Sequence, residues 1–166
     1  MPVLDYALLL DPPAFPAERY AILADRLAAL MGTGNDVLLM QAEAVLALEA
    51  AATSLARPGL RALNIVTSPY GAWFGGWLAR GGATVRNLTA SPAKPVTLEE
   101  VERALDEGPG FDLLALVHAE SASGILNPLP AIAALARQRG IVTLVDAVAS
   151  IGGHAFEVAG WASISP

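Results

Sequence analysis

Asp146 is the residue whose type and position most directly suggest chemistry. It ends the apolar segment IVTLVD at residues 141–146 and is followed by AVASIGG. A carboxylate at the end of a buried strand either caps the following turn or stays ionised beside a cationic partner. A pyridinium nitrogen is such a partner, because an aspartate beside it keeps the ring protonated and the ring can then act as an electron sink. The residues alone leave both interpretations open.

Two further polar segments follow apolar, strand-like runs. Residues 118–128, HAESASGILNP, either form a polar loop before a helix or face a ligand, in which case Ser121 can donate to an oxygen on a ring. Tyr70, in the segment TSPYGAWFG, either packs like an ordinary aromatic residue or stacks on a planar ring. Trp73 and Trp77 lie four residues apart and are expected to pack in the core or in an interface.

A third candidate is the beginning of an Ala-rich helix, AEAVLALE at residues 42–49. The N-terminus of a helix exposes free N–H groups and the positive end of the helix dipole, which suit a phosphate. The turn lacks the glycines and hydroxyls that usually assist. Glu43 would repel a phosphate if its side chain pointed inward.

Helical and strand-like segments alternate along the chain. Apolar periodicity, capping residues and glycine or proline stops predict helices over 16–31, 43–57, 70–81, 97–107 and 128–139, and strands over 61–67, 83–88, 112–118 and 141–146. Gly75 and Gly76 weaken the third helix, whereas Thr97 and Glu100 form a capping-box pattern. Apolar strands that alternate with helices predict an α/β fold, a three-layer sandwich with a mainly parallel sheet. Ligands of such sheets bind beyond the carboxyl ends of the strands.

The composition narrows the possible functions. The 166 residues suffice for one domain with a real core, and the absence of cysteine excludes disulfides, thiolate metal sites and cysteine nucleophiles. A net charge of −6 and a single lysine, Lys94, argue against nucleic acid as a partner, and His118 and His154 belong to no metal-binding motif. No apolar run is long enough and pure enough to span a bilayer, and the N-terminus has no basic region typical of a secretory signal. We therefore expect no metal, no membrane partner and a cytoplasmic location.

Four stretches, taken together and in order, resemble the class V aminotransferases. They are AEAVLALEAAATSLARPG, TSPYGAWFGGWLARGGATV, HAESASGILNPL and LVDAVASIGG, and they span roughly residues 20–155. This family includes alanine–glyoxylate, serine–pyruvate and pyridoxamine–pyruvate aminotransferases. The resemblance implies the large domain of a fold-type I enzyme with pyridoxal 5′-phosphate as cofactor.

The resemblance also implies a set of cofactor-binding residues. Asp146 would pair with the pyridine nitrogen, Val148 would pack on one face of the ring, Tyr70 would stack on the other, Ser121 would bond the ring hydroxyl oxygen, and Ala44 and Val45 would offer backbone N–H groups to the phosphate. An aromatic residue at the stacking position favours an aminotransferase over a cysteine desulfurase, whose stacking residue is a histidine.

The family's Schiff-base lysine has no counterpart within these residues. It is expected shortly after Pro166, because WASISP at residues 161–166 resembles the strand and turn that precede it in the family. Lys94 does not match the motif, since it lies in the loop SPAKP before a predicted helix. We therefore expect residues 1–166 to be a partial large domain without a catalytic residue of its own and without the C-terminal small domain.

Two functional hypotheses follow from the resemblance. In the first, the protein is an aminotransferase that moves an amino group from a small amino acid to a 2-oxo acid such as glyoxylate or pyruvate, and it forms a homodimer. In the second, the chain is a non-catalytic, stand-alone relative that acts as a binding or assembly module. An unrelated nucleotide-binding domain is disfavoured, because neither a G-x-G-x-x-G nor a P-loop motif follows a predicted strand.

Overall fold

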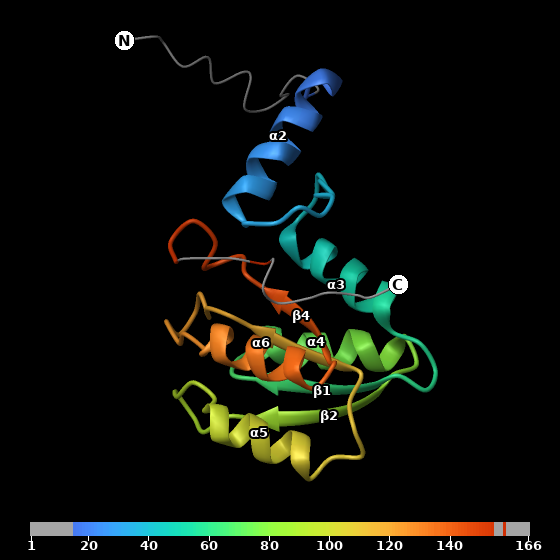
Figure 1. Cartoon of the computed structure of the whole chain (residues 1–166), viewed down its shortest axis with the longest axis vertical. Helices are drawn as coiled ribbons and strands as arrows, with labels where there is room; N and C mark the ends of the chain where they lie inside the picture. Colours follow the sequence, from blue (N-terminus) through green and yellow to red (C-terminus); the bar gives the residue numbers. More distant parts are fainter. Residues whose placement is uncertain (1–14, 155–157, 159–166) are drawn as a thin grey trace.

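A computed structural model describes residues 15–154 and residue 158 (Figure 1). Within these residues, two helices come first, and from the second of them onward helices and strands alternate as the sequence predicts. The helices are α2 (Ala17–Leu30), α3 (Ala44–Leu55), α4 (Pro69–Arg80), α5 (Leu98–Asp106) and α6 (Leu129–Gln138), and the strands are β1 (Arg61–Val66), β2 (Thr84–Thr89), β3 (Leu113–Val117) and β4 (Val142–Asp146). The strand-like segment expected at 161–166 lies outside the described residues.

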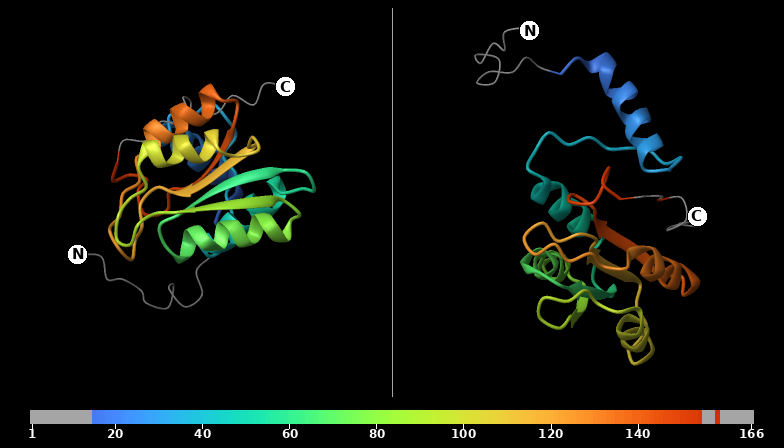
Figure 2. Two further views of the ribbon diagram at one scale, coloured as in Figure 1. Left: turned by 90° about the horizontal axis from the view of Figure 1, so that it is seen from below. Right: turned by 90° about the vertical axis from the view of Figure 1, so that its left-hand side faces the viewer.

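The four strands form one parallel sheet in the order β2-β1-β3-β4. Helices α3 and α4 cover one face, and α5 and α6 cover the other (Figure 2). The three-layer α/β architecture predicted from the sequence is therefore confirmed. All four strands have their carboxyl ends at the same edge of the sheet.

The sequence of the central strand β3 is apolar without interruption because helices cover both faces of the sheet there. Leu113, Ala115 and Val117 pack in the cluster beneath α3 and α4. Leu114 and Leu116 point the opposite way and join the cluster beneath α5 and α6. A strand covered on both faces has no position at which a polar side chain reaches water.

Local signals in the sequence set several helix ends. Thr97 and Glu100 make both hydrogen bonds of the predicted capping box at the start of α5. Gly32 and Gly140 follow α2 and α6 with φ angles of 59° and 69°, a left-handed conformation that glycine adopts without strain.

Helix α4 forms in spite of its glycines, because two of them let it approach β1 closely. A Cβ atom on Gly71 would lie 2.9 Å from the carbonyl oxygen of Ile65, and one on Gly75 would lie 2.8 Å from Nδ2 of Asn64. Asn64 uses this closeness, since its Nδ2 donates to the carbonyl oxygen of Gly71 at 2.9 Å. The glycines thus lower helix propensity but allow close packing. Ser68 caps the helix by accepting from the N–H of Tyr70 at 3.2 Å.

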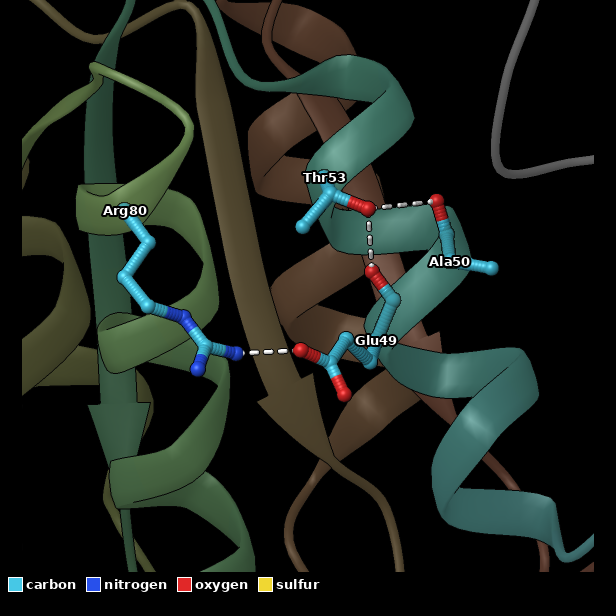
Figure 3. A network of polar contacts seen from close by, with 4 residues as sticks. All are labelled: Glu49, Ala50, Thr53 and Arg80. Carbon is cyan, nitrogen blue, oxygen red and sulfur yellow. Dashed lines mark hydrogen bonds and ion pairs between the residues drawn. The ribbon is translucent and has the colours of Figure 1, made fainter.

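Helix α3 lies beside α4, and an ion pair links the two. Arg80 of α4 pairs with Glu49 of α3, and the Thr53 hydroxyl donates within α3 to the carbonyl oxygens of Glu49 at 2.7 Å and Ala50 at 3.2 Å (Figure 3). A solvent-exposed pair of this kind contributes little to stability. Its effect is to fix the position of α3, whose N-terminus points toward the carboxyl edge of the sheet.

Helix α2 lies apart from the sheet and its covering helices (Figures 1 and 2). It contains no buried residue. None of the helices among the described residues is long and apolar enough to cross a membrane.

We predict that alanine substitutions at two neighbouring glycines of α4 have opposite effects on stability. A Cβ on Gly75 would meet Nδ2 of Asn64 and Oδ1 of Asn87, both at 2.8 Å, whereas one on Gly76 meets nothing within 4 Å. Gly75→Ala should lower the free energy of unfolding by about 1–3 kcal/mol through overpacking. Gly76→Ala should raise it by up to about 1 kcal/mol through helix propensity. Urea unfolding monitored by circular dichroism measures both. Equal effects would contradict the packing of α4 on β1.

Candidate functional site: a pocket at the carboxyl edge of the sheet

A pocket of about 180 Å³ opens at the carboxyl edge of the sheet. The strand order reverses between β1 and β3, because β1 leads to β2 on one side while β3 leads to β4 on the other. The helices that follow β1 and β3 lie on opposite faces of the sheet. Such a reversal leaves a crevice between strand ends, which is where ligands of open α/β sheets bind.

All six residues that the resemblance assigned to cofactor binding line this one pocket. They come from the first turn of α3, the first turn of α4, the loop after β3 and the end of β4, and they are Ala44, Val45, Tyr70, Ser121, Asp146 and Val148. Segments that lie far apart in the sequence therefore converge on one place.

Asp146 is the last residue of β4 and is only 6% exposed. Its Oδ1 accepts the backbone N–H of Val148 at 2.9 Å, so it does cap the following turn. Burial raises the pKa of Asp146 above its ordinary value; the Val148 N–H opposes this rise, and the charge of Glu120 adds to it. A buried carboxylate with such an environment gains from a cationic partner in the pocket. The capping and ligand-binding interpretations are thus compatible.

Tyr70 and Val148 supply partly exposed apolar surfaces on the pocket wall. Tyr70 is 36% exposed, and its ring meets that of Trp73 edge to face, with centroids 5.1 Å apart. Trp73 in turn lies 6.2 Å from Trp77, which is buried in the core as expected. Val148 is 60% exposed. Tyr70 and Val148 can both contact a flat ligand, and the aromatic row behind Tyr70 restricts its movement.

The loop after β3 contributes two neighbouring polar residues, Glu120 and Ser121. The N–H of Glu120 donates to the carbonyl oxygen of Ile125 at 2.8 Å, and the N–H of Gly124 donates back to that of Glu120 at 2.8 Å. These bonds close a tight loop that holds Ser121 at the pocket. Ser121 itself is exposed and its hydroxyl is available to a ligand.

Sequence reasoning did not single out Glu120, although it is 2% exposed and lines the pocket. Its Oε1 accepts the hydroxyl of Thr67 at 2.5 Å, and Nδ2 of Asn127 donates to the same hydroxyl oxygen at 3.0 Å. Thr67 follows β1, so this network ties two strand ends together. A carboxylate three residues after a wholly apolar strand was the available signal.

Other polar residues considered from the sequence lie outside the pocket wall. Lys94 is exposed in the turn that begins at Ser91. His118 is buried, and burial, followed by the charge of His154, lowers its pKa below the ordinary value; the two rings lie 5.8 Å apart. Glu43, by contrast, does line the pocket, at the N-cap of α3.

The charge balance of the pocket fits a cationic planar ring. Two carboxylates, Asp146 and Glu120, are buried there, and no arginine, lysine or histidine stands among the lining residues. Oε2 of Glu120 is buried without a hydrogen-bond partner in the described part of the chain. A protonated pyridine ring between Tyr70 and Val148 would supply the missing positive charge.

Comparison with known families agrees with this chemistry. The family model of the class V aminotransferases matches residues 23–163. The chain belongs to this family. Class V aminotransferases depend on pyridoxal phosphate, so the cofactor expected from the sequence is that of the family.

Several relatives of known function are similar to this chain. Pyridoxamine–pyruvate transaminase of Mesorhizobium japonicum is 33% identical over 141 residues, which cover 85% of this chain and 36% of that protein. A 2-aminoethylphosphonate–pyruvate transaminase of Pseudomonas putida is 29% identical and is matched over 80% of this chain and 36% of that protein. The chain therefore spans little more than a third of the length of these relatives.

Solved structures give the same result. Pyridoxamine–pyruvate aminotransferase from Mesorhizobium loti superposes with a TM-score of 0.79 at 30% identity, covering 85% of this chain and 36% of that one. Alanine–glyoxylate aminotransferase from Nostoc superposes with a TM-score of 0.77 at 30% identity, covering 84% of this chain and 37% of that one.

We predict that Asp146→Asn stabilises the protein without ligand, whereas Asp112→Asn destabilises it. The raised pKa of Asp146 means that its charged form is disfavoured by folding, so stability falls as pH rises from about 3.8 through the raised value. The amide introduced by Asp146→Asn keeps the bond to Val148 without the charge, and the free energy of unfolding near pH 7 should rise by about 0.5–2 kcal/mol.

Asp112 is the matched control with the opposite sign. The backbone N–H of Arg61 donates to it at 2.9 Å and holds its pKa below the ordinary value, so its contribution is present above about pH 3.8 and is lost as pH falls. Both variants retain His118, whose lowered pKa costs stability below about pH 6.5 in each, so this effect cancels. Urea unfolding between pH 4 and 8 measures both. Loss of stability in Asp146→Asn near pH 7 would contradict the electrostatic account.

Proposed function

We propose that residues 1–166 are part of the large, cofactor-binding domain of a pyridoxal-phosphate-dependent aminotransferase. The proposed reaction moves an amino group from a small amino acid to a 2-oxo acid such as pyruvate or glyoxylate. The observation that carries the proposal is a pocket with two buried carboxylates, lined by all six residues that the family resemblance assigned to the cofactor. The named relatives are transaminases, which favours this hypothesis over a non-catalytic binding module. The cytoplasmic location expected from the sequence is part of the same proposal.

Each lining residue has a distinct role in this proposal. Asp146 holds the proton on the ring nitrogen, which requires a carboxylate with no competing cation nearby. Tyr70 and Val148 hold the ring from its two faces and exclude water from them. The Ser121 hydroxyl donates to the ring hydroxyl oxygen. When bound, pyridoxal phosphate supplies an electron sink for the amino-group transfer.

The N-terminus of α3 is the proposed phosphate end of the pocket. Ala44 and Val45 begin the helix, and no side chain caps it, so backbone N–H groups there are free for an anion. No hydroxyl or basic side chain stands in this first turn to assist them. Phosphate binding at this end would therefore rest on the backbone and the helix dipole.

Glu43 favours a second candidate function, in which the ring itself is a substrate without a phosphate. Glu43 precedes α3, lines the pocket and makes no side-chain capping bond. A carboxylate at this place repels a phosphate but accepts a hydrogen bond from a hydroxymethyl group. Pyridoxamine carries such a group, and it is named in the relative from Mesorhizobium japonicum. In this candidate the amino donor is pyridoxamine and the acceptor is pyruvate.

A homodimer is also part of the proposal, and α2 offers the surface for it. Its apolar side chains are exposed, among them Tyr20 at 40%, Ile22 at 54% and Leu30 at 52%, and the nearby Leu38 is 94% exposed. Several large apolar side chains exposed on one helix favour a contact with another chain. A second copy of the chain fits best, since oligomers of one chain are the commonest assemblies.

We predict that the chain binds 4-deoxypyridoxine 5′-phosphate, which has the ring, its hydroxyl and the phosphate but no aldehyde for a lysine. Quenching of tryptophan fluorescence, with Trp73 next to Tyr70, should report the binding. Asp146→Asn should weaken it at least tenfold, or about 1.4 kcal/mol, because the ring proton loses its charged partner. Asp112→Asn should leave it unchanged, since Asp112 lies outside the pocket wall. Equal affinity in the wild type and Asp146→Asn would contradict the proposed function.

The same assay separates the two candidate functions. If the ring is a cofactor, the phosphorylated probe should bind more tightly than 4-deoxypyridoxine itself. If Glu43 selects a substrate without phosphate, the order reverses in the wild type, and Glu43→Gln restores a preference for the phosphorylated probe by about tenfold. Reversed order that persists in Glu43→Gln would contradict the role given to Glu43.

We predict that the chain sediments with twice its mass of 17.1 kDa and that α2 is responsible. Ile22→Asp should shift the equilibrium toward monomer by at least tenfold, because a charge would be buried in the contact. Ala79→Asp, also an exposed helix position, serves as the control and should leave the dimer intact. Sedimentation equilibrium measures both variants. A wild-type monomer at micromolar concentration would refute the dimer.

A further inference from the structure

Glu120 is the buried group in the pocket to which the proposed function gives no role. It is 2% exposed, lies in the loop after β3 and lines the same pocket as Asp146. Its Oε2 is buried without a hydrogen-bond partner among the described residues. A buried carboxylate oxygen without a hydrogen-bond partner lowers the stability of the folded protein. Its presence in the pocket therefore points to a functional role for Glu120.

A chain of hydrogen bonds with a fixed direction leads to Glu120. The N–H of Val96 donates to Oδ1 of Asn127 at 3.1 Å, which fixes the orientation of the amide. The amide nitrogen therefore faces the other way and donates to the carbonyl oxygen of Val117 at 2.8 Å and to Oγ1 of Thr67 at 3.0 Å. Because Thr67 accepts from Asn127, its single hydrogen is directed to Oε1 of Glu120, 2.5 Å away.

This arrangement holds Glu120 as an acceptor and stabilises its carboxylate in place. The Thr67 hydroxyl donates to Oε1 and is itself held by Asn127, so the position of the carboxylate is set by residues from two strand ends. The network thus does more than anchor a loop. Anchoring alone needs only an acceptor at the Oε1 position, which a neutral amide at position 120 would supply equally well.

The negative charge of Glu120 acts on Asp146. After burial, the Glu120 charge is the other cause that raises the pKa of Asp146. The further titratable groups that face the pocket are Glu43 at the start of α3 and Tyr70 on α4, while His118 and His154 lie near the ends of β3 and β4 but outside the wall. None of the lining groups is cationic. Two carboxylates therefore share one ligand-binding space with no positive charge on its wall.

We propose that Glu120 is a positioning residue, held by Thr67 and Asn127, whose carboxylate adds to that of Asp146 so that the pocket selects a ring with a protonated nitrogen over a neutral ring. The inference rests on the proposed function, because it assumes that a pyridine ring occupies the pocket. It adds a residue to the site and states a selectivity: the protonated ring binds more tightly because it compensates two buried negative charges instead of one.

The test compares Glu120→Gln with the wild type, using 4-deoxypyridoxine 5′-phosphate as the probe between pH 6 and 9. Glutamine keeps the shape and can still accept from Thr67, so only the charge is removed. The absorbance of the bound probe reports the protonation of its ring. In the wild type the ring should stay protonated to a higher pH than in Glu120→Gln. The affinity of the variant should fall about three- to tenfold below the wild type near pH 6, where the free ring is protonated, and should approach the wild type near pH 9.

A second pair of variants tests the hydrogen-bond chain without touching Glu120. Thr67→Val removes the donor to Glu120 and should reproduce part of the shift in ring protonation, whereas Thr67→Ser keeps the hydroxyl and should behave like the wild type. This pair also decides the matter if Glu120→Gln does not fold, as judged by circular dichroism.

Three outcomes would overturn the inference. Identical absorbance and affinity in the wild type and Glu120→Gln would show that the charge has no role. A loss of affinity that is the same at every pH, with an unchanged spectrum, would show that Glu120 only anchors the loop. Failure of the wild type to bind the probe would remove the ring site itself and with it the proposed function, which distinguishes it from the first two outcomes.

Discussion

The close approach of α4 to β1 is the contact on which the pocket depends. Gly71 and Gly75 leave no room for a Cβ atom, so the helix axis lies nearer to the sheet than ordinary side chains would permit. Tyr70, one residue before Gly71, lies in the first turn of α4 and lines the pocket at the carboxyl edge of β1. Helix α3 packs on α4 in turn, and its first turn reaches the same edge. Larger residues at these glycines would move two walls of the pocket together.

The charged side chains fall into two groups, the ion pairs on the surface and the buried carboxylates of the pocket. The ion pairs of the described residues, such as Arg61 with Asp112 and Arg139 with Asp106, lie outside the pocket wall. They are solvent-exposed and contribute little. The pocket instead buries Asp146 and Glu120 without a cation, which works against folding until a ligand arrives. Proteins tolerate such cost where a ligand compensates it, and this is the pattern of a binding site rather than of a core.

Much of this structure could be predicted from the sequence, and the remainder has a physical reason. Strands β1 to β4 and the ends at Gly32 and Gly140 follow from local patterns, and the ends of β1, β3 and β4 pointed to Tyr70, Ser121, Asp146 and Val148, which line the pocket. Helix α4 looked doubtful because propensity counts glycine as a cost, while the compensating contact with Asn64 is tertiary. The partners of Glu120 could not be predicted either. Thr67, which donates to Glu120, lies 53 positions away from it, and Asn127 reaches Glu120 only through Thr67, so the network depends on the pairing of β1 with β3.

The two ends of the pocket differ in how firmly they determine a ligand. At one end Asp146 and Glu120 are buried and held by hydrogen bonds, so the positions of both carboxylates are fixed by the fold. At the other end Glu43 is exposed and its side chain makes no capping hydrogen bond with α3. The side chain can therefore turn toward a ligand or toward water. In the proposed function, recognition of the ring is therefore a property of the scaffold, whereas recognition of a phosphate depends on one exposed carboxylate at a helix N-terminus. In that proposal, a single substitution at Glu43 would change which form of the ring is accepted, while the sheet, the strand ends and the ring-binding residues stay the same. A change confined to one site residue is the kind of change by which one fold hosts different functions.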